Sequence, residues 1–240
     1  MAISPRFQKL SDQLPDELAQ AGFTRQNLPT WARAENPASS LRLDSWLWRH
    51  PSGTEARTAW IEGPRSAVVN LMVFPLNANA VPIFASELIA FGPKVHVAVI
   101  DHQMAGGRAS EPPESHDILT PLHQRWAAHF PSGGELPAWA TSHFTPWCIY
   151  TRGLPVEDIG LLEEAFLDFW RAWVSHWLPR ANSDEPAHPA LTTYLHHHIA
   201  NTPGRPFLGK FFGEAWAERY LKQFMYGPLR PHRELLSLSL

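Results

Sequence analysis

An acidic residue lies inside one of the most apolar stretches of this sequence. Glu87 falls in the run VPIFASELIAF, residues 81–91, which has the composition of a β-strand. Because alternate residues of a strand point to opposite faces, Glu87 shares its face with apolar side chains, namely Ile83, Ala85, Ile89 and Phe91. Burial favours the acid form of a carboxyl group and raises its pKa, so Glu87 is predicted to hold a proton for use in a reaction. The alternative is a glutamate at a sheet edge that points to water.

Two other polar residues fall in strand-like apolar runs. Asn70 shares a face with Val68, Met72 and Phe74, where a buried amide needs hydrogen-bond partners. It either bridges parts of the structure or contacts a ligand. Asp101 ends a later run and is predicted to fix a turn.

Three consecutive histidines, His196, His197 and His198, lie in the interior of the sequence. Adjacent residues on a helix point about 100° apart, so the three cannot bind one metal ion. They form a polar helix edge, or one of them lines a pocket. No metal site is predicted, and no GxGxxG, P-loop, HExxH or GxSxG motif occurs.

The C-terminal segment has many basic side chains. They are Arg205, Lys210, Arg219, Lys222, Arg230 and Arg233, against the acidic Glu214, Glu218 and Glu234. This distribution is typical of a solvated helix face. It is also what a docking site for an acidic partner, or an anchor for ligand carboxylates, would require.

A succession of strand-like runs must position these residues. They span residues 41–50, 56–62, 67–74, 82–91 and 95–101. The links between the last four are too short for a crossover helix, so neighbouring strands are predicted to be antiparallel. Residues 68–74 and 95–100 are apolar on both faces and therefore need helices as cover on both sides. The expected fold is α/β: a three-layer α/β/α sandwich with a central antiparallel sheet flanked by helices.

Helical spacing of apolar residues is strongest over residues 157–178. Further helices are predicted over residues 189–200 and 206–224, with a break at 201–205. A short helix over residues 7–19 is expected to be interrupted at Pro15. Residues 144–152 read as another strand, and residues 106–114 and 131–137 read as loops.

Composition limits the class of protein. A chain of 240 residues fits one domain, expected to span residues 1–240 as a monomer. The net charge of −3 gives no reason to expect nucleic-acid binding, and the single cysteine, Cys148, excludes an intrachain disulfide. No apolar run is long enough to span a membrane, and the sequence begins without a signal peptide's hydrophobic core, so a cytoplasmic protein is expected.

Taken together, these segments resemble the ferredoxin-dependent bilin reductases. NLMVFP at 70–75, PIFASE at 82–87 and the run at 95–101 are similar to that family's central strands. FTPWCIYTR at 144–152 is similar to another of its strands. FGEAWAERYLKQ at 212–223 is similar to its C-terminal helix, especially that of the phycocyanobilin-forming members. The order and spacing of these motifs, from about residue 67 to 226, carry the resemblance.

The resemblance implies an enzyme that reduces biliverdin IXα, or a close linear tetrapyrrole, to a phytobilin. Reduced ferredoxin would be the electron donor, no flavin or metal cofactor would be bound, and side chains would donate protons to radical intermediates. The ligand pocket would lie between the sheet and the C-terminal helices. The family's central-strand aspartate falls on Glu87, which keeps the acid but lengthens it.

Other positions depart from the family pattern. A histidine of the phycocyanobilin-forming members falls on Asn70, and a glutamate falls near Thr58. The family's second catalytic aspartate falls on Thr202, after Asn201, so one acid is absent; His197 or His198 is a candidate replacement.

Basic residues complete the expected site. Arg205, and with it Arg152, is expected to anchor the propionates.

Two other functions remain open. Reduction of a chlorophyll-derived open tetrapyrrole fits a glutamate at this place, which also resembles the red chlorophyll catabolite reductases. A non-catalytic bilin carrier fits the loss of the acid at Thr202. A carrier would change the bilin spectrum without consuming electrons.

Overall fold

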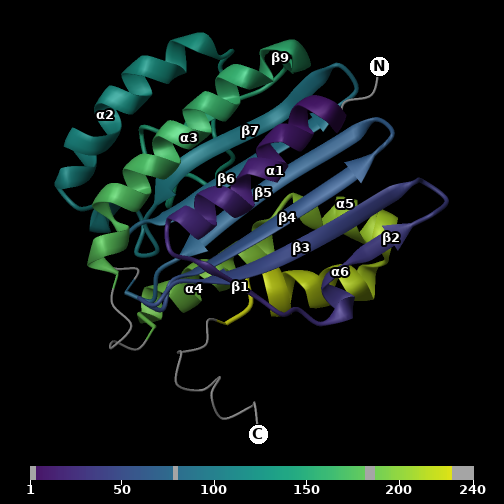
Figure 1. Ribbon diagram of the computed structural model, residues 1–240. Coiled ribbons are helices and arrows are strands. Elements are labelled where there is room, and N and C mark those ends of the chain that lie inside the picture. The colour runs from purple at the N-terminus through teal and green to yellow at the C-terminus, as the bar shows by residue number, and fades with distance from the viewer. Residues whose placement is uncertain (1–3, 78–80, 182–186, 229–240) are drawn as a thin grey trace, which may run out of the picture.

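The computed structural model describes residues 4–77, 81–181 and 187–228 of the chain, and side chains from residue 7 onward. A mixed-length sheet in which every pairing is antiparallel forms its centre (Figure 1). The long strands are β3 (Leu41–Arg49), β4 (Glu55–Gly63), β5 (Ser66–Phe74), β6 (Ile83–Phe91) and β7 (Lys94–Gln103). They are neighbours in chain order, as the short links predict.

Short strands extend the sheet on either side of these five. They are β1 (Thr24–Gln26) and β2 (Ala34–Asn36), both paired with β3, and β8 (Ile149–Thr151) and β9 (Leu154–Pro155), both paired with β7. The sequence predicted no strands at the positions of β1, β2 and β9.

Helices cover both faces of the sheet, as Figure 1 shows. On one face lie α1 (Ser4–Gln20), α2 (Glu114–Trp126) and α3 (Ile159–His176), and on the other lie α4 (Pro189–Asn201), α5 (Gly204–Phe212) and α6 (Glu214–Tyr220). Each face has its own apolar core, one built around Phe166 and Trp170 of α3 and the other around Tyr194 of α4 and Leu221. The predicted three-layer sandwich is confirmed.

The register of the sheet places two of the candidate residues together. Asn70 on β5 lies directly opposite Glu87 on β6, and Glu87 lies opposite Val99 on β7. Side chains directly opposite each other in an antiparallel pair have Cβ atoms about 4.5–5.5 Å apart. The alternation of β6 is also confirmed, because Phe84 and Leu88 enter the α3 core whereas Glu87 faces the C-terminal helices.

The predicted break of the first helix at Pro15 is wrong. Helix α1 continues through Pro15, which is exposed and costs the helix one hydrogen bond. Phe7, Leu10, Leu14 and Leu18, spaced three or four residues apart, are all buried against the sheet. This burial outweighs the missing bond.

Two helical regions differ from the sequence-based expectation. Helix α2 lies in a stretch for which the sequence predicted no helix, and it contains Pro121. The helix predicted over residues 206–224 is divided at Gly213, whose φ of 95° a residue with a side chain rarely adopts. Beyond α6, residues Leu221–Met225 form a π-helical turn that brings the end of the described chain back to the sheet.

The strand predicted over residues 144–152 is mostly wrong, because only Ile149–Thr151 pairs with β7. The Thr145 N–H donates to the Asp101 carboxylate at 3.0 Å instead of to a strand, and the Thr145 hydroxyl donates to the same group at 2.5 Å. Asp101 is fully buried and also accepts the His102 N–H at 2.9 Å. Asp101 therefore lies inside β7, not at its end, and it holds the distant loop at Thr145, so the prediction that it ends its strand and fixes a turn is wrong.

Candidate functional site

A cavity of about 400 Å³ lies between the sheet and the helices α4, α5 and α6. Cavities of this size accommodate drug-sized and cofactor-sized ligands. Strands β5, β6 and β7 form its floor, and the segment from Leu136 to Arg152 forms one wall. Most of the lining is apolar or aromatic, for example Ile61, Val68, Met72, Ile89, Val97, Val99, Trp139, Phe144, Phe207 and Leu208.

Glu87 and Asn70 form the polar centre of this cavity. The Asn70 amide donates to Glu87 Oε1 at 3.5 Å, which is the long limit of a hydrogen bond. Burial raises the pKa of Glu87, and the bond from Asn70 opposes that shift in part. The side chain of Glu87 nevertheless keeps partial contact with solvent. Glu87 is therefore an acid with a raised pKa that water still reaches.

The other end of the Asn70 amide is unsatisfied. Asn70 is 8% exposed, and its Oδ1 has no hydrogen-bond partner among the described residues. A buried acceptor without a partner costs about 1–3 kcal/mol, so a ligand that brings an N–H to it gains that energy. The arrangement fits a ligand with N–H donors close to Glu87.

Helix α4 contributes His198 and Thr202 to the cavity. His198 is buried, its ring stacks on Tyr194 with centroids 4.0 Å apart, and its Nδ1 donates to the Tyr194 carbonyl at 3.1 Å. Burial lowers the pKa of His198 to about 3, so the ring is neutral at neutral pH. His198 thus lines the site, but a neutral imidazole with this pKa is a poor proton donor at neutral pH.

Four expected site residues lie outside the lining or at its edge. His196 is exposed, and His197 donates from Nε2 to the Trp139 carbonyl at 2.7 Å. Asn201 is exposed and donates to the His197 carbonyl at 2.8 Å. Arg205 donates to a carbonyl of α4, that of Ile199, at 2.9 Å.

Arg152 lies at the cavity and is exposed. Its guanidinium lies 5.9 Å from the centroid of the Tyr150 ring, and Tyr150 also lines the cavity. Of the two arginines expected to bind carboxylates, the structure brings Arg152 to the cavity and places Arg205 beside it. Arg230 and Arg233 of the basic segment lie outside the described residues.

Thr58 does not face the cavity. Its hydroxyl lies 3.4 Å from the Trp46 carbonyl and its side chain belongs to the face covered by α1, whereas the next residue, Ala59, lines the cavity. The period of two explains this outcome, since a shift of one residue moves a side chain to the other face.

Several lining residues were missed by sequence reasoning, among them Gln103, Trp139, Tyr220 and Tyr226. Tyr226 is 8% exposed and its hydroxyl pairs with the Thr202 side chain. Burial, and then the nearby Glu87 carboxylate, raise the pKa of Tyr226. Its only sequence signal is its position just after the apolar pair Phe224 and Met225.

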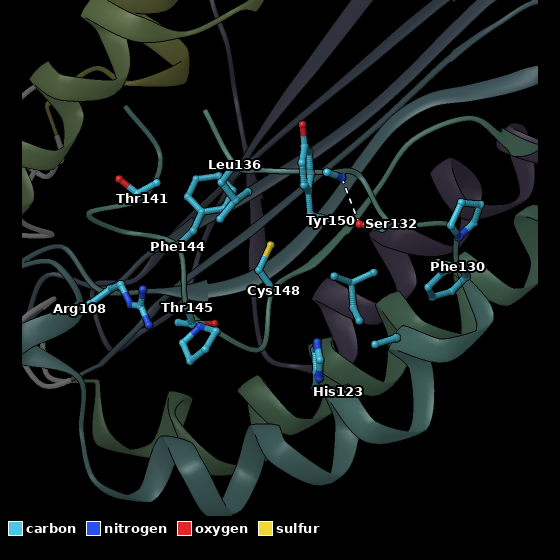
Figure 2. A pocket seen from close by; sticks show the side chains of 15 residues that line it. Arg108, His123, Phe130, Ser132, Leu136, Thr141, Phe144, Thr145, Cys148 and Tyr150 are labelled. Atoms are coloured by element: carbon cyan, nitrogen blue, oxygen red, sulfur yellow. Dashed lines mark hydrogen bonds between the residues drawn. The ribbon is translucent and has the colours of Figure 1, made fainter. Parts of the chain in front are cut away.

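A second cavity, of about 410 Å³, lies on the other side of the wall and shares Leu136, Phe144 and Tyr150 with the first (Figure 2). Figure 2 shows Cys148 and His123 at this cavity. Burial raises the pKa of the Cys148 thiol well above its usual value, so it is a weak nucleophile. Among the described residues, no cluster of three or more His, Cys, Asp or Glu has the arrangement of a metal site. The same part of the chain contains no helix with the length and apolarity of a membrane span.

Comparison with known proteins agrees with this architecture. The chain is 27% identical over 208 residues to a phycoerythrobilin:ferredoxin oxidoreductase of Prochlorococcus marinus strain MIT 9211, which covers 80% of this chain and 79% of that protein. It is 24% identical over 229 residues to a 15,16-dihydrobiliverdin:ferredoxin oxidoreductase of strain NATL1A, covering 92% and 96%.

The fold is similar to that of tomato phytochromobilin synthase in complex with biliverdin, with a TM-score of 0.78 and 19% identity over 92% of this chain and 82% of that one. The sequence profile described as ferredoxin-dependent bilin reductase matches residues 20–227. This chain therefore belongs to the ferredoxin-dependent bilin reductase family.

Proposed function

We propose that this protein reduces biliverdin IXα, or a close linear tetrapyrrole, with electrons from reduced ferredoxin. The observation that supports this most is the pair formed by Glu87 and Asn70 on the floor of a mainly apolar cavity. Glu87 supplies an acid, and the unpaired Asn70 oxygen supplies an acceptor for a pyrrole or lactam N–H. A flat, mostly apolar tetrapyrrole with N–H groups along one edge fits that combination.

Glu87 acts as the proton donor in this proposal. A two-electron reduction of a double bond takes two electrons from ferredoxin and two protons. Glu87 protonates the radical formed by the first electron, and the resulting carboxylate is reprotonated by water, because its side chain is partly accessible. Burial raises the pKa of Glu87 and so favours the protonated form that this step uses.

The proposed extent of reaction is one two-electron reduction. Among the described residues that line the cavity, Glu87 is the sole carboxylic acid. Thr202 stands where the family resemblance places a second acid, and His198 is neutral, with a pKa of about 3. A second reduction at a distant ring would need its own proton donor, which the described lining does not offer.

Basic side chains anchor the ligand and the electron donor. Arg152 at the cavity edge is placed to pair with a propionate, with Arg205 as a second anchor. A shallow hollow next to the cavity shares Phe91 and Phe207 with it.

That hollow is the proposed docking site for ferredoxin. Arg65 and Lys210, both exposed, lie in it and form no ion pair with the described residues. Two other basic residues of the segment are engaged elsewhere: Lys222 pairs with Glu218 at 2.5 Å, and the Arg219 guanidinium lies 4.2 Å from the centroid of the Trp31 ring. An acidic ferredoxin bound at Arg65 and Lys210 would deliver electrons close to the tetrapyrrole.

Two experiments test the proposal. Biliverdin should bind at micromolar concentration, about −8 kcal/mol, with a clear change in its visible spectrum. Anaerobic addition of reduced ferredoxin should then consume the bilin. No spectral change well above that concentration would overturn the bilin assignment, and binding without consumption would identify a carrier. Consumption of a chlorophyll-derived open tetrapyrrole in place of biliverdin would favour that substrate class.

A further inference from the structure

Tyr226 stands at the end of the described C-terminal region and lines the cavity with Thr202 and Glu87. Its ring lies 5.5 Å from that of His198, and its side chain is buried. Glu87 and Tyr226 line the same cavity, and the Glu87 carboxylate contributes to the raised pKa of Tyr226.

The hydrogen bonds around Thr202 leave the Tyr226 proton free. Thr202 Oγ1 accepts the backbone N–H of Gly204 at 3.3 Å. Thr202 keeps its own hydroxyl proton for donation to the Tyr226 oxygen, and a pairing in this direction is the one that lowers the pKa of Tyr226 against the larger effect of burial. In that arrangement the donors run from Gly204 through Thr202 to Tyr226, and the phenolic O–H is left to donate to a ligand, because among the described residues Thr202 is the one side chain with which the hydroxyl is paired.

A buried ionic network fixes the backbone on both sides of Tyr226. Arg57 of β4 donates from Nη1 to the Phe224 carbonyl at 2.7 Å and to the Gly227 carbonyl at 2.8 Å. Glu55 holds the same guanidinium at 2.9 Å. A side chain at residue 227 would meet the Gln223 carbonyl oxygen 2.6 Å from its Cβ, so only glycine allows this path of the backbone. The tyrosine is thus held in place before a ligand binds.

We propose that Tyr226 is a substrate-binding residue whose hydroxyl donates a hydrogen bond to an end-ring carbonyl oxygen of the tetrapyrrole beside Glu87. This inference rests on the proposed function. A linear tetrapyrrole carries a lactam carbonyl at each end, and such an oxygen is the acceptor that the free O–H lacks. Charge gathers on that oxygen when an electron enters the conjugated system, and a donor in a dry site stabilises it.

Tyr226 holds its proton throughout. Burial raises its pKa well above the usual value of a tyrosine, so the phenol stabilises charge without becoming the acid, and proton delivery stays with Glu87. Tyr226 and Thr202 then replace a second acid by a neutral donor at the same place, which agrees with a single reduction.

The test compares biliverdin binding by the wild type, Tyr226→Phe, Thr202→Val and the double variant, by visible titration of the purified protein. Tyr226→Phe should weaken binding about 3- to 10-fold, as expected for one neutral hydrogen bond. It should also shift the absorption maximum of the bound bilin, because the carbonyl loses its donor. Thr202→Val should shift the absorption maximum in the same direction by a smaller amount. The double variant should show the same shift as Tyr226→Phe, because Thr202 acts through the Tyr226 hydroxyl.

Tyr194→Phe is the matched control. Tyr194 is fully buried, its hydroxyl donates to Gln103 at 2.5 Å, and it does not line the cavity. It should alter the melting temperature and leave the position of the bound-bilin band unchanged. If Tyr226→Phe binds biliverdin with the affinity and spectrum of the wild type, the role of Tyr226 is overturned, but the proposed function is not. If Tyr226→Phe does not fold, a wild-type spectrum in Thr202→Val overturns it. A wild type that does not bind biliverdin would instead overturn the proposed function, and this inference with it.

Discussion

Replacing Glu87 with glutamine removes the proton and keeps the shape of the side chain. The substituted amide can still pair with Asn70, so biliverdin binding should stay within a few-fold of wild type. A positioned acid contributes about 10²–10⁴-fold in rate, which is about 3–5.5 kcal/mol of activation free energy. The described lining offers no second carboxyl group, and the pKa of His198 is about 3. Turnover should therefore fall toward the upper end of that range, by roughly 10³–10⁴-fold.

The assay is anaerobic turnover of bound biliverdin with reduced ferredoxin, followed by visible absorption and electron paramagnetic resonance. Electrons still arrive in Glu87→Gln while the proton does not, so an organic radical should accumulate. Glu87→Asp should retain activity, since it keeps the acid. Glu163→Gln is the matched control, because burial also raises the pKa of Glu163 but it lies on α3, away from the cavity.

Stability gives an independent readout of the same residue. The folded-state pKa of Glu87 is raised, so the native state binds its proton more tightly than the unfolded chain does. That contribution to stability is fully present below the usual carboxyl pKa and is lost as pH rises through the folded-state pKa. Glu87→Gln should therefore raise the melting temperature of the ligand-free protein at neutral pH, and the difference should shrink on acidification.

The kinetic outcome decides between the two roles of Glu87. Near wild-type turnover with the same product in Glu87→Gln, together with the higher melting temperature, would leave Glu87 as a buried group without catalytic function. Glu87 would then not be the proton donor.

Three further predictions concern the partner of this acid, the buried Asp101 and the docking of ferredoxin. Asn70→Leu removes the bond that lowers the pKa of Glu87, so the loss of turnover with rising pH should move to higher pH, and biliverdin should bind about 3- to 10-fold more weakly in a titration. Thr145→Val removes the hydrogen bond from the Thr145 hydroxyl to the buried Asp101, so the free energy of unfolding measured in urea should fall by about 1–3 kcal/mol. An unchanged denaturation midpoint would show that this bond does not hold the loop. The turnover rate at limiting ferredoxin should fall as the salt concentration rises, because the Debye length is only about 3 Å at 1 M salt. Lys210→Ala should weaken that salt dependence. Equal rates at low and high salt would show that ferredoxin does not dock through these charges.

The sequence predicted the sheet well because its signals are local. Short links require antiparallel neighbours, and the alternation of β6 places Glu87 on the face opposite Phe84 and Leu88. The pairing of Glu87 with Asn70 was not predicted. It depends on the register between β5 and β6. The alternation fixes which face a side chain points to, but not which residues of the two strands lie opposite each other.

The remainder of the site depends on packing between distant segments. Which histidine faces the cavity is decided by the rotation of α4 against the sheet, and the chosen one is His198. Tyr226 reaches the cavity because a π-helical turn and Arg57, far away in the sequence, fix the end of the described chain. Neither feature leaves a periodic pattern in the sequence.

The mass of the product shows how many hydrogen atoms the site adds to biliverdin. Biliverdin would be turned over anaerobically with excess reduced ferredoxin. The products would be separated by chromatography, and their masses would be measured by mass spectrometry. With Glu87 as the single acid, a bilin with two added hydrogen atoms should accumulate as the end product, and Glu87→Gln should fail to form it. Complete conversion to a bilin with four added hydrogen atoms, or recovery of unchanged biliverdin, would contradict a site with Glu87 as its single acid.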